Sequence, residues 1–266
     1  MARLLSRRQF VMLPLAGLLV PRLAGADAKE VGARTYEAEI GVLFNLLTFR
    51  LSGRVSREID RASGRYRVTM SGTGSGVTAG METEGIIRDG RFMPTETRGF
   101  HTIRGRENRV TISYDYGRRL VEYHSLGYTF FLGRRRQADD VIRLAADQHV
   151  DDLVSAELNF AADALDKDSD GAYRVTVVRR ARPTEEAPDD VSPDGYRAEL
   201  TTLRFRALPD ANGGRLTALV DLTGFSSWAR STRPASVAFG PDRHLESVAS
   251  SLILGTTFTL RLSSAS

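Results

Sequence analysis

The amino-acid sequence predicts a mainly β protein, built as an antiparallel open or half-barrel sheet with one or two short helices packed against it. Three observations lead to this fold class. Apolar and polar residues alternate in several runs, as in strands that bury one face. Turn signals, most of them containing glycine, separate these runs. One segment, at about 139–165, instead repeats its apolar residues every three or four positions, which is typical of helix.

The N-terminal segment 1–26 resembles an export signal of the twin-arginine type. Two adjacent arginines precede the apolar stretch 11–20, which has the length of a signal-peptide core and is too short to span a membrane. Small residues follow, so we expect cleavage near Ala26 or Ala28. The signal predicts a periplasmic protein that meets the twin-arginine translocation machinery during export. An ordinary secretory signal is the alternative interpretation.

Composition limits the remaining possibilities. The chain contains 37 Lys and Arg, 33 Asp and Glu, and no cysteine. The predicted leader holds four of the arginines and no acid. The rest of the chain is therefore close to neutral, which gives no support for nucleic acid as a partner. Residues 27–266 are expected to form a single β-rich domain that is stabilised by its own core, since no disulfide can form.

The expected strands follow one another with short connections. Alternation is clearest in four runs, at 49–56, 66–70, 109–116 and 173–177. The turn signals between strands fall at 62–64, 89–90, 116–117, 169–171, 211–214 and 240–242. This spacing of many strands is typical of a sandwich, a barrel or an open half-barrel.

Two segments interrupt the strand pattern. The helical spacing at 139–165 predicts two short helices, broken near 148–152. The acidic, proline-rich segment 182–195 is expected to be a flexible surface loop. Strand patterns continue on both sides of this loop, which favours one domain over two.

An ordered series of features resembles the exported domain-of-unknown-function family 3108. The features are a strand opening at 36–41, the glycine-bearing segment 71–80, a strand–turn–proline element at 89–94, a helix start at 151–156 and a terminal hairpin between 233 and 262. The resemblance spans most of residues 34–262. It implies a half-barrel of the kind that carries lipoproteins or lipids across the periplasm. It supplies no catalytic residues, and the long loop at 182–195 departs from the family pattern.

Two runs are apolar at almost every position and could line a cavity for an acyl chain. They are 42–47 and 128–132, and the candidate lining residues are Val42, Phe44, Leu46, Phe49, Phe130 and Phe131. A ligand site of this kind is mainly apolar with few polar anchors. Burial in a core is the alternative explanation. The basic run Arg134, Arg135 and Arg136 could contact an anionic group on a lipid, a lipopolysaccharide or a partner protein, or could be a solvated loop.

A third candidate is a calcium site. Asp166, Asp168 and Asp170 precede Gly171 in the spacing of the first half of a calcium loop. The twelfth position is Val177 rather than a bidentate glutamate, so an acidic β-turn is the alternative. The four histidines are dispersed, and neither a zinc spacing nor a nucleophile elbow is present in the sequence. We therefore expect no cofactor apart from a possible calcium ion.

The function predicted on this basis is non-enzymatic. The protein would bind a lipid or another amphipathic envelope component and act in envelope maintenance or transport. A structural or interaction module that binds an envelope protein or polysaccharide without a cavity is the first alternative. A hydrolase with an unrecognised site is the second.

Overall fold

Thirteen strands form one continuous sheet in the part of the chain that the structure describes. The structure is a computed structural model, and it describes residues 29–263 apart from 43, 45, 104, 182–185, 187–188, 193–194, 210–214, 223–228 and 230–231. The predicted export signal and its cleavage sites lie outside the described residues. No helix among the described residues is long and apolar enough to cross a membrane.

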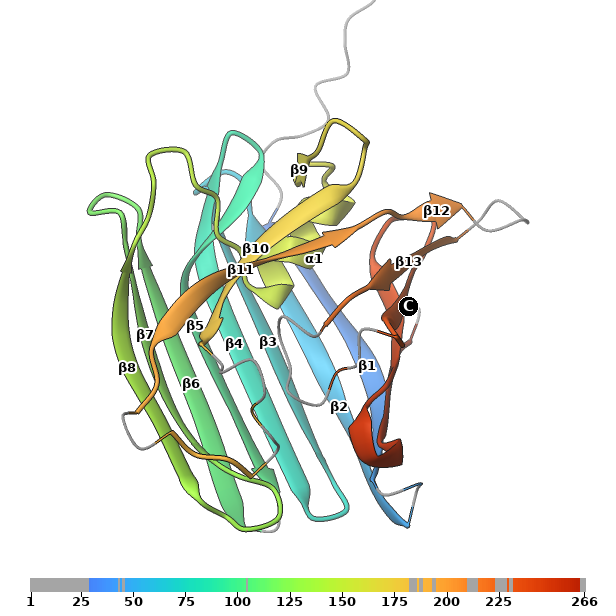
Figure 1. The fold of residues 1–266 in the computed structure, drawn as a ribbon. Coiled ribbons are helices and arrows are strands. Elements are labelled where there is room, and N and C mark those ends of the chain that lie inside the picture. Colours follow the sequence, from blue (N-terminus) through green and yellow to red (C-terminus); the bar gives the residue numbers. More distant parts are fainter. Residues whose placement is uncertain are drawn as a thin grey trace, which may run out of the picture.

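The first half of the sheet is an antiparallel meander of eight long strands, each paired with the next (Figure 1). Its turns include Gly64, Gly76 and Gly90, which adopt φ values of 64°, 69° and 79°. Glycine takes these values without a steric penalty. The strands are β1 (Lys29–Val42), β2 (Leu47–Asp60), β3 (Arg65–Gly74), β4 (Val77–Arg88), β5 (Arg91–Ile103), β6 (Arg106–Asp115), β7 (Leu120–Tyr128) and β8 (Arg135–Arg143).

The last strands of the chain extend this sheet from the free side of β1. Tyr36 of β1 pairs with Leu262 of β16, so the C-terminal part of the chain returns to the first strand. The order continues through β15, β14 and β13 to β12 at the edge, and β8 is the opposite edge. These strands are β12 (Leu208–Pro209), β13 (Leu216–Val220), β14 (Ala235–Phe239), β15 (Leu245–Ser251) and β16 (Thr257–Leu262), with the 3-10 turn η1 (Ile253–Gly255) between the last two.

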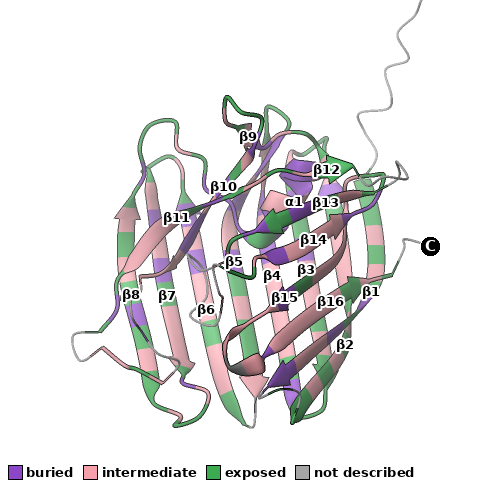
Figure 2. Cartoon of the chain, turned by 45° about the vertical axis from the view of Figure 1, so that its right-hand side comes forward, coloured by how far each residue is buried: buried purple, intermediate pink, exposed green. Residues whose placement is uncertain are grey.

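A short helix and a three-stranded sheet lie against the concave side of the large sheet (Figures 1 and 2). The helix is α1 (Leu153–Ala161), and its N-cap Asp152 accepts a hydrogen bond from the backbone N–H of Ser155. The small sheet has the order β11–β10–β9. Its strands are β9 (Asp166–Lys167), β10 (Tyr173–Arg180) and β11 (Ala198–Phe205). The predicted fold class, an open antiparallel sheet with a helix packed against it, is confirmed.

The predicted helical segment at 139–165 is only partly helical. Residues 139–143 belong to strand β8, in which Asp140 pairs with Tyr123 of β7. The helix covers only Leu153–Ala161. The error has a physical cause: Ala138, Ile142 and Leu144 also lie on one face of a strand, and cross-strand pairing with β7 outweighs the helical spacing of the other apolar residues.

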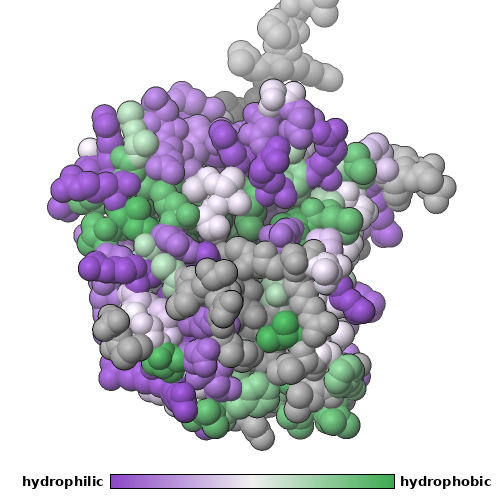
Figure 3. Space-filling model, viewed as in Figure 1, coloured by the Kyte–Doolittle hydropathy of each residue, from purple (hydrophilic) through white to green (hydrophobic). Residues whose placement is uncertain are grey.

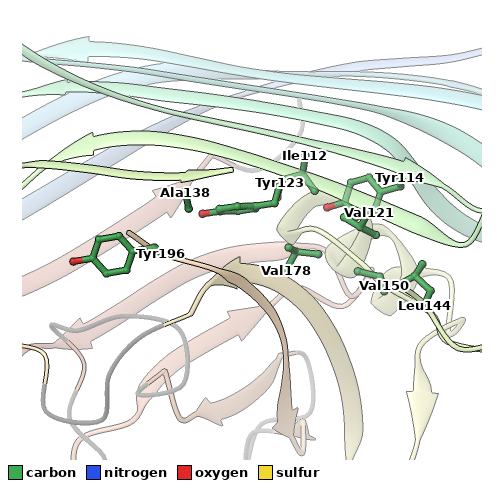
Figure 4. Packing of buried hydrophobic residues seen from close by; sticks show 9 residues of the cluster. All are labelled: Ile112, Tyr114, Val121, Tyr123, Ala138, Leu144, Val150, Val178 and Tyr196. Carbon is green, nitrogen blue, oxygen red and sulfur yellow. The ribbon is translucent and has the colours of Figure 1, made fainter. Parts of the chain in front are cut away.

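The core consists of three clusters on the concave side. One cluster joins β6, β7 and β8 to the small sheet and includes Val121, Tyr123 and Val178 (Figure 4). A second joins β2, β3 and β5 to α1 through Phe92 and Leu158. The third surrounds Phe160 and includes β10, β13 and β14. The helix and the small sheet therefore cover part of the concave side. The remaining part of the concave side is a candidate for a binding site.

Candidate functional site

The meander has two ends with different chemistry. We call the end where β1–β2, β3–β4, β5–β6 and β7–β8 are joined the tip end. The other end, where β2–β3, β4–β5 and β6–β7 are joined and where the chain leaves β8 toward α1, is the helix end. The core clusters of α1 and the small sheet lie toward the helix end, because Ile59, Tyr66 and Phe92 adjoin its turns and are buried there.

The concave face toward the tip end is lined by apolar side chains, many of which are only partly buried, whereas Val42 and Val77 are buried. Val55 of β2 packs against the α1 cluster, so Leu51, four residues earlier on the same strand, points to the same face. The register carries this face across the sheet, since Leu51 pairs with Gly74, Gly74 with Val77, and Val77 with Ile103. The partly exposed apolar residues of this face are Ile40, Phe49, Leu51, Met70, Met81, Ile103 and Val110.

Glycines keep this face shallow near its centre. A Cβ at Gly53 would lie 2.6 Å from the ring of Tyr36, and one at Gly72 would lie 2.2 Å from the Tyr36 hydroxyl oxygen. The ring of Tyr36 therefore lies across two neighbouring strands where no side chain stands in its way. Tyr36 is 2% exposed, and burial raises the pKa of its hydroxyl. The result is an apolar floor whose polar residues include His101, Arg106 and Asn108.

The candidate lining residues of the sequence analysis separate into two groups. Phe49 and Phe130 make an edge-to-face ring contact with centroids 6.4 Å apart, and Phe130 contacts Phe131 at 5.0 Å. Four strands lie between β2 and β7 in the sheet, so the β7–β8 connection reaches across the concave side to make this contact. These three aromatic residues form one cluster at the tip end.

The other three candidates do not line the concave face together. Val42 is buried at 2% exposure, whereas Phe44 and Leu46 are each 81% exposed. The apolar runs 42–47 and 128–132 are not strands with two apolar faces. Their described residues 44, 46 and 129–132 lie in hairpin connections. Phe44 has a φ of 58°, and its N–H donates to the Gly255 carbonyl at 3.1 Å. A run that is apolar at almost every position gives only a weak signal for such a turn.

The three arginines after the β7–β8 connection have different surroundings. Arg136 is half-buried, and its Nε donates to the Asp190 carbonyl oxygen at 2.8 Å. It also lies 3.8 Å from Glu186, which pairs with Arg180 at 2.7 Å. Arg134 and Arg135 are exposed. The described residues of the acidic loop therefore pack against β8, and two of the three arginines stay available to an external anion.

The three aspartates of the calcium hypothesis are paired with basic groups of the chain. Asp166 lies 3.1 Å from His149 Nδ1, and Asp168 accepts a hydrogen bond from Arg204 Nε at 2.5 Å. Asp170 lies 3.3 Å from Arg204 Nη2. Among the described residues, no group of three or more His, Asp or Glu side chains is placed to hold a metal ion. The calcium site stays an untested prediction.

A buried polar cluster closes the concave face between the apolar floor and the helix end. The sequence analysis did not identify this cluster. Asp152 Oδ2 accepts hydrogen bonds from the hydroxyls of Thr83 and Thr97, both at 2.5 Å. Asp151 accepts from Arg91 Nη2 at 2.9 Å and from Asn159 Nδ2 at 2.8 Å. Their pairing depends on β4, β5 and α1 meeting in space, and only the adjacent aspartates before a helix start could have pointed to it.

Burial and the neighbouring positive charge have opposite effects on the pKa of Asp151. Burial raises the pKa of this carboxyl to about 6, although the Arg91 guanidinium and the Asn159 amide favour its charged form. Burial likewise raises the pKa of Tyr116 well above its usual value, and the hydroxyl donates to the Val150 carbonyl at 3.3 Å. These groups position α1 and are not open to a ligand on the apolar floor.

A polar cleft of about 470 Å³ lies at the helix end. It includes Arg88, Arg91 and Arg119 together with Asp89, Asp147 and Asp166, so opposite charges balance and favour neither an anion nor a cation. His149 is on its rim, within reach of Asp166. The cleft has no apolar lining comparable to that of the tip end, and it is the weaker candidate for a ligand site.

Comparison with known proteins leaves the family open. No family model matches the chain, and no curated protein matches it. The resemblance to family 3108 therefore stays a prediction. One of the similar solved structures is described as a β-barrel-like protein of the domain of unknown function DUF1849 from Brucella abortus. It has a TM-score of 0.37 and 11% sequence identity, and the match covers 90% of this chain and 98% of that chain.

Proposed function

We propose that this protein is an exported, non-enzymatic periplasmic protein that binds a lipid or another amphipathic envelope molecule on the concave face near the tip end. The apolar floor is the single observation that carries the proposal. Several of its side chains, among them Phe49, Leu51 and Ile103, remain partly exposed although they face inward beside the buried Val42 and Val77. An alkyl chain laid on this floor would gain about 0.8 kcal/mol for each CH₂ that leaves water.

The aromatic cluster at the tip end supports the same function. Phe49, Phe130 and Phe131 form their cluster at the tip end of the floor, where the β7–β8 connection crosses the concave side and could contact a bound alkyl chain. His101 and Asn108 lie on the inward face and supply polar atoms that could orient a headgroup. Export to the periplasm, which the N-terminal sequence predicts, would bring the protein to the compartment in which amphipathic envelope molecules need a carrier.

The experiment combines native mass spectrometry with displacement of a fluorescent fatty acid. Ile103 faces the floor and the neighbouring Thr102 faces the opposite side, so Ile103→Glu and Thr102→Glu are a matched pair. We expect the wild type and Thr102→Glu to co-purify with lipid-sized adducts and to bind the probe. Ile103→Glu should bind at least about tenfold more weakly, because a carboxylate is costly in an apolar site.

Two results would contradict the proposal. One is a clean apo mass for the wild type together with no binding of the fatty acid, which would favour an interaction module without a cavity. The other is equal binding by the two glutamate variants, which would place the lipid elsewhere. Turnover of an ester probe by the wild type would instead favour the hydrolase alternative.

A further inference from the structure

The tip end carries an unusual share of the exposed apolar surface. Of the twelve large apolar side chains that are well exposed among the described residues, seven lie there. They are Phe44, Leu46, Leu47, Phe100, Tyr128, Phe131 and Leu132. Figure 3 shows apolar atoms along this lower end of the molecule, as well as higher on the same face. Clustered exposure of this kind marks an interaction surface, whereas scattered single residues do not.

These side chains surround the end of the sheet, which distinguishes them from the apolar floor. Phe100 lies on the convex face, where its ring would be 2.4 Å from a Cβ at Gly80. Phe44 packs its ring over Gly255 at the η1 turn, where a Cβ would be 2.5 Å from the ring. Leu132 is 61% exposed in the β7–β8 connection. A single ligand on the concave face could not cover residues on both faces of the sheet.

The β7–β8 connection within this apolar surface is basic, although Asp189 also reaches it and accepts a hydrogen bond from the Leu132 N–H at 2.8 Å. The segment 127–136, which is described throughout, contains three arginines and no acid. Arg134 and Arg135 are exposed, whereas Arg136 is engaged with Asp190. Arg106, at the start of β6, is exposed and donates to the Phe130 carbonyl at 3.3 Å. Exposed aromatic and leucine side chains interleaved with arginine are typical of surfaces that enter the interfacial region of a bilayer.

The turns of the helix end are charged rather than apolar, and they serve as a comparison for the tip end within the same protein. Its turns carry charges of both signs, such as Asp60 with Arg61 and Asp115 with Arg118. None of the twelve exposed large apolar residues lies in the turns 61–64, 89–90 or 116–119. The two ends of one meander therefore differ in the chemistry that they present to solvent.

We propose that the tip end docks on the surface of a phospholipid bilayer that contains anionic headgroups. The apolar side chains enter the interface and Arg134 and Arg135 pair with headgroup phosphates. The inference rests on the proposed function, because docking at this end places the tip end of the apolar floor at the membrane that would supply or receive the lipid.

The absence of cysteine from the chain allows a direct test with single labels. Leu132→Cys and Ala62→Cys place an environment-sensitive nitrobenzoxadiazole group at the tip end and at the helix end. The protein is purified from a bacterial periplasm and mixed with vesicles of phosphatidylcholine alone or with phosphatidylglycerol. We expect a blue shift and an intensity gain at position 132 only, and a stronger response with phosphatidylglycerol.

Paired variants separate the apolar and basic contributions. Leu46→Ser with Leu132→Ser should lower vesicle binding at least about tenfold, since two exposed apolar side chains are removed from the interface. Leu208→Ser with Leu219→Ser removes side chains of similar exposure on β12 and β13 and should leave binding unchanged. Arg134→Gln with Arg135→Gln should abolish the preference for phosphatidylglycerol and retain the weaker binding to phosphatidylcholine.

Three results would overturn the docking proposal. They are no response at position 132, equal responses at positions 62 and 132, and a response at 132 that rises with protein concentration without vesicles, which would indicate self-association. These outcomes are independent of fatty-acid binding, so failure of docking and failure of the lipid site can be told apart. The four serine substitutions are at exposed positions, which leaves the fold intact in each pair.

Discussion

Replacing Asp152 by alanine removes the carboxylate on which the start of α1 and two buried threonines depend. Asp152 caps the helix, and its other oxygen accepts from Thr83 and Thr97. Thr83 is 0% exposed, Thr97 is 5% exposed and Asp152 is 6% exposed, so the two hydroxyls have no contact with bulk water that could replace the lost acceptor. The perturbation therefore acts on the element that closes the apolar floor toward the helix end.

The expected cost follows from these contacts. Loss of an N-cap costs about 1 kcal/mol. Each buried hydroxyl left without an acceptor costs about 1–2 kcal/mol. Removal of a buried carboxylate recovers part of its desolvation cost and opposes these losses. We expect Asp152→Ala to lower the free energy of unfolding by about 3 kcal/mol, which is a large part of the stability of an ordinary domain.

Urea unfolding followed by circular dichroism measures this change, and a second background tests its cause. In a protein that carries Thr83→Val and Thr97→Val, the hydroxyls are absent and Asp152→Ala should cost only the cap, about 1 kcal/mol. If the alanine substitution costs the same in both backgrounds, the threonines do not depend on Asp152. The reasoning about the buried cluster would then be refuted.

Three further predictions concern packing and pH. Gly72→Ala should lower the free energy of unfolding by about 1–3 kcal/mol, because the new Cβ would meet the buried ring of Tyr36; an unchanged urea midpoint would contradict this. The pKa of Asp151 is raised by burial from its ordinary value of 3.8 to about 6, so this group alone should remove about 2 kcal/mol of stability as pH rises from 4 to 6. Asp151→Asn should lose this part of the pH dependence, and identical pH slopes of the urea midpoint would argue against it. Burial raises the pKa of Glu157, but the His244 hydrogen bond and the neighbouring positive charge of Arg57 hold this pKa below its usual value. The interaction therefore stabilises the fold above pH 4.5, and this stabilisation is lost on acidification. Glu157→Gln should cost about 2–3 kcal/mol at pH 7 and less at pH 3, measured by the same urea titration.

Much of the fold was predictable because strands with one buried face alternate apolar and polar residues, and turns between them have their own sequence signals. The run 49–56 and the turn at 89–90 show these patterns, and both are found in the meander as expected. The helix boundaries were not predictable, since Val141 and Leu144 follow a helical spacing and only the pairing with β7 makes 139–143 a strand. Local periodicity cannot report a partner that is distant in the chain.

The candidate site was predictable only in part. Phe49, Phe130 and Phe131 were selected for apolar character and do form one cluster. Phe44 and Leu46 were selected for the same reason and are exposed at the tip of a hairpin. The same apolar run can be core, cavity or rim, because its environment depends on which part of the curved sheet lies opposite.

The sequence by itself determined the class of fold, through alternation and turn chemistry, and it predicted an exported protein that has no disulfide to stabilise it. Only the tertiary structure decided which apolar residues are buried, which line the concave face and which surround the tip end. It also joined Asp152 to Thr83 and Thr97 across long sequence separations. The physical reason is that alternation assigns a side chain to one face of a strand, whereas the curvature of the sheet and the elements packed on it decide what that face meets.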